Sequence, residues 1–333
     1  MCKKNADKYP YLIVILMHDF NRNLYPCDPY IPFNTEMHRL NAIAKLLDQY
    51  VDILNKWKHI GSYDMNIIDS LYNKSDDVKI KTGKVYGALW DKYCGDMVKE
   101  AVDIIKERFS NNNIPLKLIK GKKVLDIGCG SGRYSCALAM LGAEKVIGID
   151  YGEMGLRKGR ELARINRLSN LQFKKGNIHE MPFKDEEFDF CFNNGVFQHS
   201  GSIEIPTKEL YRVLKKGGYS WYYIYGDGGL FWYARKKINN FMKNAIPQEY
   251  AMKILNDIGM PGNRFIFCDN WYVLREKHTS NEKLLRIFKN TGFSEYRRAS
   301  NGRSTDPDYL VVNGTLKDRK MWGDAGLRYL IRK

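Results

Sequence analysis

The segment "VLDIGCGSG" (residues 124–132) places one acidic side chain just ahead of three closely spaced glycines. Glycines at 128, 130 and 132 allow the backbone to turn sharply after an apolar strand and to approach a ligand without a clash from Cβ. A dinucleotide loop has the spacing G-x-G-x-x-G, but here Arg133 stands where that loop needs a small residue. Asp126 would repel a pyrophosphate and suits the cationic end of a ligand. The loop therefore indicates a nucleotide-derived ligand that carries positive charge.

The elements around this loop alternate between short apolar segments and helical stretches. Strands are predicted at 123–128, 145–150, 171–177, 188–194, 219–226, 293–299 and 327–332. Helices are predicted near 85–109, 132–141, 153–167, 204–214, 231–258 and 281–291. Alternation at this spacing predicts an α/β, Rossmann-like fold: a seven-stranded, mostly parallel sheet with helices on both faces.

Composition narrows the class of protein. The chain has 333 residues, 44% of them hydrophobic, and a formal net charge of +16, more than half of which lies in the last third. No window reaches the roughly 18 apolar residues of a membrane span, and the N-terminus lacks a signal-peptide pattern, so we expect a cytoplasmic protein without a membrane partner. The seven cysteines form no C-x-x-C pair, and no metal site is predicted.

The glycine loop resembles motif I of the class I S-adenosylmethionine-dependent methyltransferases. Four further segments resemble that family's motifs in the expected order: "VIGIDYG" (146–152), "GNIHEMPF" (176–183), "FDFCFNNGVFQH" (188–199) and "ELYRVLKKGGY" (209–219). Five ordered matches are more specific than any one of them. The resemblance implies S-adenosyl-L-methionine as the cofactor and methyl transfer as the activity.

The resemblance also implies roles for individual residues in cofactor binding. Asp126 and the backbone near Gly128 and Asn193 should face the methionine part, and Asp150 should accept hydrogen bonds from both ribose hydroxyls. Residues expected around the adenine are Tyr151, Asn177, which departs mildly from the family's aspartate, and Ile178. The remaining expected cofactor-binding residues are Gly130 and Gly132 in the loop and Tyr86 and Trp90 on a helix over the cleft.

Catalysis and acceptor binding are predicted from side chains near the ends of the fourth and fifth parallel strands. His199 follows motif IV, and an imidazole there could take a proton from an acceptor hydroxyl; the alternative is that it only stabilises its loop. The acceptor site is expected to use Tyr225, Asp269, Trp271 and His278, which match a loose pattern of small-molecule methyltransferases. Strand packing alone is the alternative for Tyr225.

These patterns divide the chain into an N-terminal extension (1–84), which could cap the cleft, and a methyltransferase domain (85–333) with an acceptor-site insertion at about 227–280. The leading hypothesis is methyl transfer to a hydroxyl or amine of a small molecule, such as a sugar or a biosynthetic intermediate. Because the chain is basic, anionic molecules are included among the expected acceptors. An RNA methyltransferase that uses the basic last third, and a non-catalytic protein with this fold, stay open as alternatives. The sequence does not predict the oligomeric state.

Overall fold

The computed structural model describes residues 97–257, 270–273, 276–303 and 308–333, together with Val14 and Met17. The predicted N-terminal extension, the site residues Tyr86 and Trp90 on the first predicted helix, and Asp269 of the predicted acceptor site lie outside the described residues. The described residues belong to two compact units, which divide after Trp232 and again after Val273. The unit that holds residues 97–232 contains the sheet.

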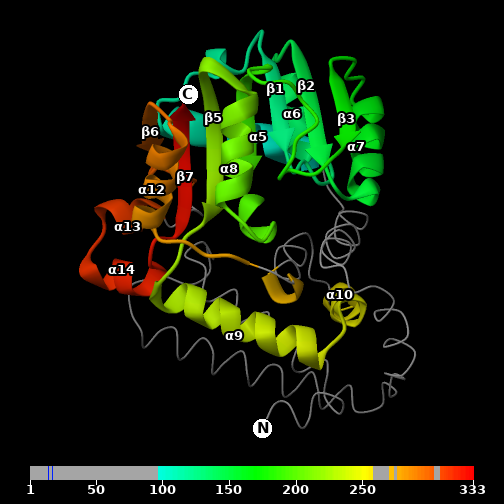
Figure 1. Ribbon diagram of the computed structural model, residues 1–333. Helices are drawn as coiled ribbons and strands as arrows, with labels where there is room; N and C mark the ends of the chain where they lie inside the picture. The colour runs from blue at the N-terminus through cyan, green and yellow to red at the C-terminus, as the bar shows by residue number, and fades with distance from the viewer. Residues whose placement is uncertain (1–13, 15–16, 18–96, 258–269, 274–275, 304–307) are drawn as a thin grey trace. The chain divides into compact units, whose positions relative to one another are not determined.

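Seven strands form one sheet in the order β3-β2-β1-β4-β5-β7-β6 (Figure 1). Neighbouring strands from β3 to β5 are parallel, whereas β7 runs antiparallel to both β5 and β6. The strands are β1 (Lys123–Ile127), β2 (Lys145–Asp150), β3 (Leu171–Lys175), β4 (Phe188–Asn194), β5 (Leu214–Tyr225), β6 (Glu295–Arg298) and β7 (Gly326–Arg332). The predicted seven-stranded, mostly parallel sheet is confirmed.

Helices cover both faces of the sheet, and successive residues of a strand pack into two different cores. Val124, Val146 and Phe190 pack with one set of helices, whereas their neighbours Leu125 and Ile147 pack with the other. The helices on the first face are α5 (Met97–Asn111), α6 (Arg133–Met140) and α7 (Glu153–Ile165); those on the second are α8 (Glu204–Val213) and α12 (Asn281–Thr291).

The structure corrects several predicted boundaries after β4. Strand β5 begins at Leu214, five positions earlier than predicted, because Leu214 already pairs with Phe188 across an irregular register. The single helix predicted at 231–258 is two helices, α9 (Gly229–Ala245) and α10 (Gln248–Asp257), with Pro247 at the break. The helix predicted at 281–291 is confirmed as α12, whose N-cap Ser280 accepts a hydrogen bond from the Lys283 amide.

Two short helices were not predicted from the sequence: α13 (Asp308–Asn313) and α14 (Leu316–Trp322). The second has a capping box, in which Thr315 and Asp318 each accept from the other's backbone amide. Trp322 at its end is almost fully buried. The capping box was the sequence signal that could have revealed this helix.

Gly132 begins α6 in a left-handed conformation, with φ at +75°. A Cβ at this position would lie 2.5 Å from the Phe173 ring and 2.8 Å from the Gly159 Cα. Gly121 has a similar φ of +69°, but a Cβ there would meet no heavy atom within 4 Å. Both glycines therefore have a positive φ, but only at Gly132 would a Cβ clash with neighbouring atoms.

Replacing Gly132 by Ala is expected to lower the free energy of unfolding by about 2–4 kcal/mol, because backbone strain adds to overpacking against Phe173. Gly121→Ala, the matched control, should cost about 1 kcal/mol from backbone strain alone. Urea unfolding of both variants measures the difference. Equal losses would show that packing at Gly132 does not constrain the loop.

Candidate functional site

The glycine loop after β1 is held against the end of β2 by hydrogen bonds from its own backbone. The amides of Gly128 and Cys129 donate to the Ile149 carbonyl at 2.8 and 3.0 Å, and the Gly130 amide donates to Asp150 Oδ2 at 2.9 Å. These bonds require the loop to turn back toward β2, and Gly128 and Gly130 adopt positive φ values of +70° and +51°. The loop lies at the carboxyl edge of the parallel strands, where ligands bind in this class of fold.

The Asp150 carboxylate also accepts a hydrogen bond from the Gly152 amide, at 2.7 Å to Oδ1. Burial raises its pKa above the ordinary value, although the amides of Gly152 and Gly130 oppose the shift by stabilising the charged form. The Tyr151 amide adds to this stabilisation. A carboxylate has about four acceptor sites, so Asp150 can still accept a hydrogen bond from a ligand.

Asp126 lies in β1 and is 3% exposed. Its Oδ2 accepts a hydrogen bond from Ser135 Oγ on α6 at 2.5 Å. Burial raises the pKa of Asp126 to about 7, and the negative charge of Asp150 adds to this effect, whereas the Ser135 hydrogen bond opposes it. The sequence motif did not reveal Ser135, which turns out to be the partner of this carboxyl group.

Asn193 lies near the end of β4 and is fully buried. Its side-chain amide donates to the Tyr223 carbonyl at 3.4 Å, but its Oδ1 accepts no hydrogen bond within the described part of the chain. Buried polar atoms are rarely left without a partner, so this oxygen suits a ligand that donates. Nearby, a Cβ at Gly128 would lie 2.3 Å from the Val196 side chain, so the backbone at Gly128 approaches β4 closely.

The residues predicted to surround an adenine follow β2 and β3. Tyr151 is 42% exposed, and the Lys175 ammonium lies 5.9 Å from its ring centre. Asn177 Oδ1 accepts from the His179 amide at 3.1 Å, which forms a local turn, and Ile178 is partly buried against the core. The structure thus leaves the Tyr151 ring accessible and uses the Asn177 side chain in its own loop.

Aromatic side chains at the ends of β4 and β5 bring together three of the residues predicted for catalysis and acceptor binding. The Tyr225 ring centre lies 5.5 Å from that of His199 and 6.1 Å from that of His278. Trp232, which the sequence analysis did not single out, lies 5.3 Å from Tyr225 and 4.7 Å from His278. We call His199, Tyr225, Trp232 and His278 the aromatic cluster.

The two histidines of the aromatic cluster differ in how their ring nitrogens are used. His278 Nδ1 lies 2.7 Å from the Gly226 carbonyl, and its Nε2 lies 3.1 Å from a Glu276 carboxylate oxygen. A carbonyl can only accept, so Nδ1 carries a proton and both nitrogens are engaged in structure. His199 is on a short 3₁₀ helix (Phe197–His199), and its Nε2 lies 3.2 Å from the buried amide of Gln198.

Trp271 belongs to the second compact unit and is fully buried there. The Asn239 side-chain amide on α9 lies 3.0–3.1 Å from the carbonyls of Asn270, Trp271 and Val273, which fixes this backbone segment. The aromatic cluster belongs to the other unit, and the place of Trp271 in an acceptor site stays a prediction.

The described residues hold no group of three or more His, Cys, Asp or Glu side chains placed to bind a metal. None of the helices in the described ranges is long and apolar enough to cross a membrane.

Comparison with protein-family models gives a match to a methyltransferase domain over residues 118–289, which is more than half of the chain. The matched range includes the glycine loop, Asp150, Asn193 and most of the aromatic cluster. The chain belongs to the class I S-adenosylmethionine-dependent methyltransferases. The family assignment made from the five motifs is confirmed.

Curated relatives of this methyltransferase match over a shorter range. A sterol 24-C-methyltransferase from Pneumocystis carinii is 32% identical over 31% of the chain and 28% of its own length. A demethylmenaquinone methyltransferase from Staphylococcus carnosus is 35% identical over 31% of the chain and 43% of its own length. The chain thus spans less than half the length of these relatives. A solved structure from Methanococcus maripaludis, described as a putative methyltransferase of this kind, has 19% identity and a TM-score of 0.44 over 78% of the chain and 96% of its own.

The cofactor of this methyltransferase family is S-adenosylmethionine, and the described residues fit its chemistry. The ligand carries an ammonium group and two adjacent ribose hydroxyls, all of which donate hydrogen bonds. Among the described residues Asn193 Oδ1 is a buried acceptor without a hydrogen-bond partner, and the Asp150 carboxylate retains capacity to accept. Acceptors at the ends of β2 and β4 therefore match the donors of the cofactor.

Folding stability without cofactor should fall as the pH rises from about 5 to about 8, because folded Asp126 holds its proton up to about pH 7 whereas the unfolded carboxyl loses it near pH 4. Asp126→Asn removes this contribution, so the fall should be smaller by about 3 kcal/mol over that range. Urea unfolding at both pH values measures it.

Asp189→Asn is the matched control for this pH experiment. Burial acts to raise the pKa of Asp189, but hydrogen bonds from Lys215 and the Lys123 amide lower it below its ordinary value. Asp189 is therefore ionised throughout the range, and its replacement should lower stability equally at both pH values. A wild-type pH dependence in Asp126→Asn would show that Asp126 is already ionised at pH 5.

Proposed function

We propose that the protein transfers a methyl group from S-adenosylmethionine to a hydroxyl or amine group of a small molecule. The observation that carries the proposal is the Asp150 carboxylate, which fixes the glycine loop through Gly130 and can still accept a hydrogen bond from a ligand at the end of β2. The family match over residues 118–289 supports the same activity.

The cofactor would be held by groups at or near the ends of four neighbouring strands, β3, β2, β1 and β4. Asp150 accepts from the ribose hydroxyls, and Tyr151 and Ile178 pack against the adenine, with Asn177 beside it. Asp126 and Asn193 face the ammonium of the methionine part. Burial raises the pKa of Asp126 to about 7, and an ammonium bound beside it would favour the ionised form.

The bound cofactor supplies a methyl group that its positively charged sulfur already activates. The protein therefore has to align the acceptor with this group, exclude water and remove the proton of a hydroxyl acceptor. His199 is the general base in this proposal, because it follows β4 and lies beside Tyr225. To take a proton through Nε2 it has to release that nitrogen from the Gln198 side-chain amide, which can only donate. His278 instead orients the aromatic cluster, because both of its ring nitrogens are held by Gly226 and Glu276.

The acceptor site in this proposal includes the aromatic cluster, and Asp269 and Trp271 stay predictions from the sequence. Four rings in contact offer apolar surface with few charges, which suits a small organic acceptor with an apolar part. The relatives named for a sterol and for demethylmenaquinone support an acceptor of this size class. No observation on the described residues favours the RNA alternative.

Asp150→Asn should weaken binding of S-adenosylmethionine about 10- to 100-fold, because one of two charge-assisted ribose contacts is lost. It should weaken 5′-methylthioadenosine equally, since this analogue keeps the ribose. Asp126→Asn should weaken only S-adenosylmethionine, which carries the ammonium group. Calorimetry with both ligands distinguishes the two roles, and unchanged affinity for S-adenosylmethionine in both variants would contradict the proposed cofactor site.

His199→Ala should lower kcat at least about 100-fold with little change in the KM of the acceptor, because a general base acts on the chemical step. Acceptors would first be found by incubating the protein with labelled cofactor and metabolite extracts. Added imidazole should restore part of the lost rate. Near-wild-type turnover, or a loss confined to KM, would assign His199 to acceptor positioning or loop stability.

A further inference from the structure

Strand β3 is an edge strand, because the sheet order pairs it only with β2. The Val146 amide donates to the Asn170 carbonyl and the Gly176 amide donates to the Asp150 carbonyl, which fixes the alternation along β3. Even-numbered residues from 170 to 176 therefore direct their backbone groups to β2. The backbone groups of Leu171, Phe173 and Lys175 point away from the sheet and make no hydrogen bond with any other residue in the described ranges.

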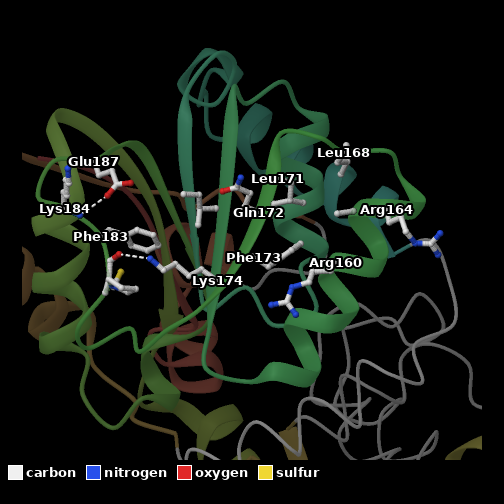
Figure 2. A pocket seen from close by; sticks show the side chains of 14 residues that line it. Arg160, Arg164, Leu168, Leu171, Gln172, Phe173, Lys174, Phe183, Lys184 and Glu187 are labelled. Atoms are coloured by element: carbon white, nitrogen blue, oxygen red, sulfur yellow. Dashed lines mark hydrogen bonds between the residues drawn. The ribbon is translucent and has the colours of Figure 1, made fainter.

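A groove with a volume of about 930 Å³ lies along this edge. Figure 2 shows β3 between α7, which carries Arg160 and Arg164, and the segment with Phe183, Lys184 and Glu187. None of the residues predicted for the cofactor, the acceptor or catalysis lines the groove. The groove is therefore separate from the site described above.

The groove carries positive charge that the described residues neutralise only in part. Arg164 and Lys184 make no ion pair with any residue that the structure describes, and the Lys174 ammonium donates to the Pro182 carbonyl instead of to a carboxylate. Glu187 is the one acid among the described lining residues, and its carboxylate already binds the Lys123 ammonium. Arg160 does pair with an acid, Glu153.

We propose that this groove binds an acidic, extended segment of another protein, which adds to the sheet as a strand beside β3. An added strand would pair with the outward backbone groups of residues 171, 173 and 175, the mode known as β-augmentation. Its side chains would point alternately to the two faces of the sheet. Cations lie on both faces, with Arg160 and Arg164 on the α7 side and Lys174 and Lys184 on the other, so acidic residues are favoured on both faces.

Charge also decides against a second copy of this chain as the occupant. Two β3 edges would bring Lys174 and Lys175 of one copy against the same lysines of the other. Exposed lysines are a common means of preventing such edge-to-edge pairing. An acidic partner turns this repulsion into attraction, whereas a nucleic acid would satisfy the cations but leave the backbone groups of β3 unpaired.

The test uses a fluorescein-labelled peptide of about eight residues made of Glu and Val, long enough to form a strand. Fluorescence anisotropy should show binding to the wild-type chain. Arg164→Glu combined with Lys184→Glu should weaken binding about tenfold at low salt. The matched control, Lys208→Glu with Lys289→Glu, changes two exposed lysines on α8 and α12 that make no ion pair, and it should bind like wild type.

Two further measurements separate strand addition from simple charge attraction. The same peptide with alternate backbone nitrogens methylated keeps its charge but cannot pair with an edge, and it should bind at least about tenfold more weakly. By NMR, peptide binding should slow amide exchange at Leu171, Phe173 and Lys175 and leave Gln172 and Lys174 unchanged.

Four results would overturn the proposal. They are no binding to wild type, equal binding by the charge-reversed variant, equal binding of the methylated peptide, or tighter binding of a single-stranded RNA oligomer that the same charge reversal abolishes. The last result would assign the groove to nucleic acid.

Discussion

The carboxylate of Asp150 joins three backbone segments, because it ends β2 while accepting hydrogen bonds from Gly130 of the glycine loop and Gly152 at the start of α7. A buried charge is costly unless hydrogen bonds offset its lost hydration. The two amides supply these hydrogen bonds, and the same bonds fix the position of the glycine loop. The positive φ values of Gly128, Gly130 and Gly132 follow from that position. Glycine spacing in the motif is therefore a consequence of how the loop must reach Asp150.

Much of the fold could be predicted from the sequence because the residues of each core strand or helix favour the structure that the element adopts. Strands β1, β2 and β4 and helices α7 and α12 begin at or next to their predicted residues, since each has a clear apolar pattern and a glycine or cap at its end. The predictions failed where local signals were weak or conflicting. Strand β5 begins within "LKKGG", whose lysines and glycines do not suggest a strand, and only its pairing with β4 makes it one.

The candidate site could be predicted only in part, because motifs identify residues but not the partners that chain folding brings to them. The acids at 126 and 150 were identified from one loop and one strand end. Ser135, which donates a hydrogen bond to Asp126, is nine residues away with no pattern to mark it. The aromatic cluster combines positions 199, 225, 232 and 278, and its geometry depends on the Gly226 carbonyl and Glu276 holding one imidazole. Spacing along the chain carries no information about such distances.

Phe173 connects the two functional regions of the sheet unit through different atoms. Its ring lies against Gly132 and Gly159, which forbids a side chain at the start of α6 and thereby determines how the glycine loop approaches α7. Its backbone amide and carbonyl face outward on the β3 edge, where the groove lies. A strand added there would pair with the backbone and leave the ring in place. One residue can therefore support the cofactor loop and an edge interaction together, because a β-strand separates its side-chain direction from its hydrogen-bonding direction.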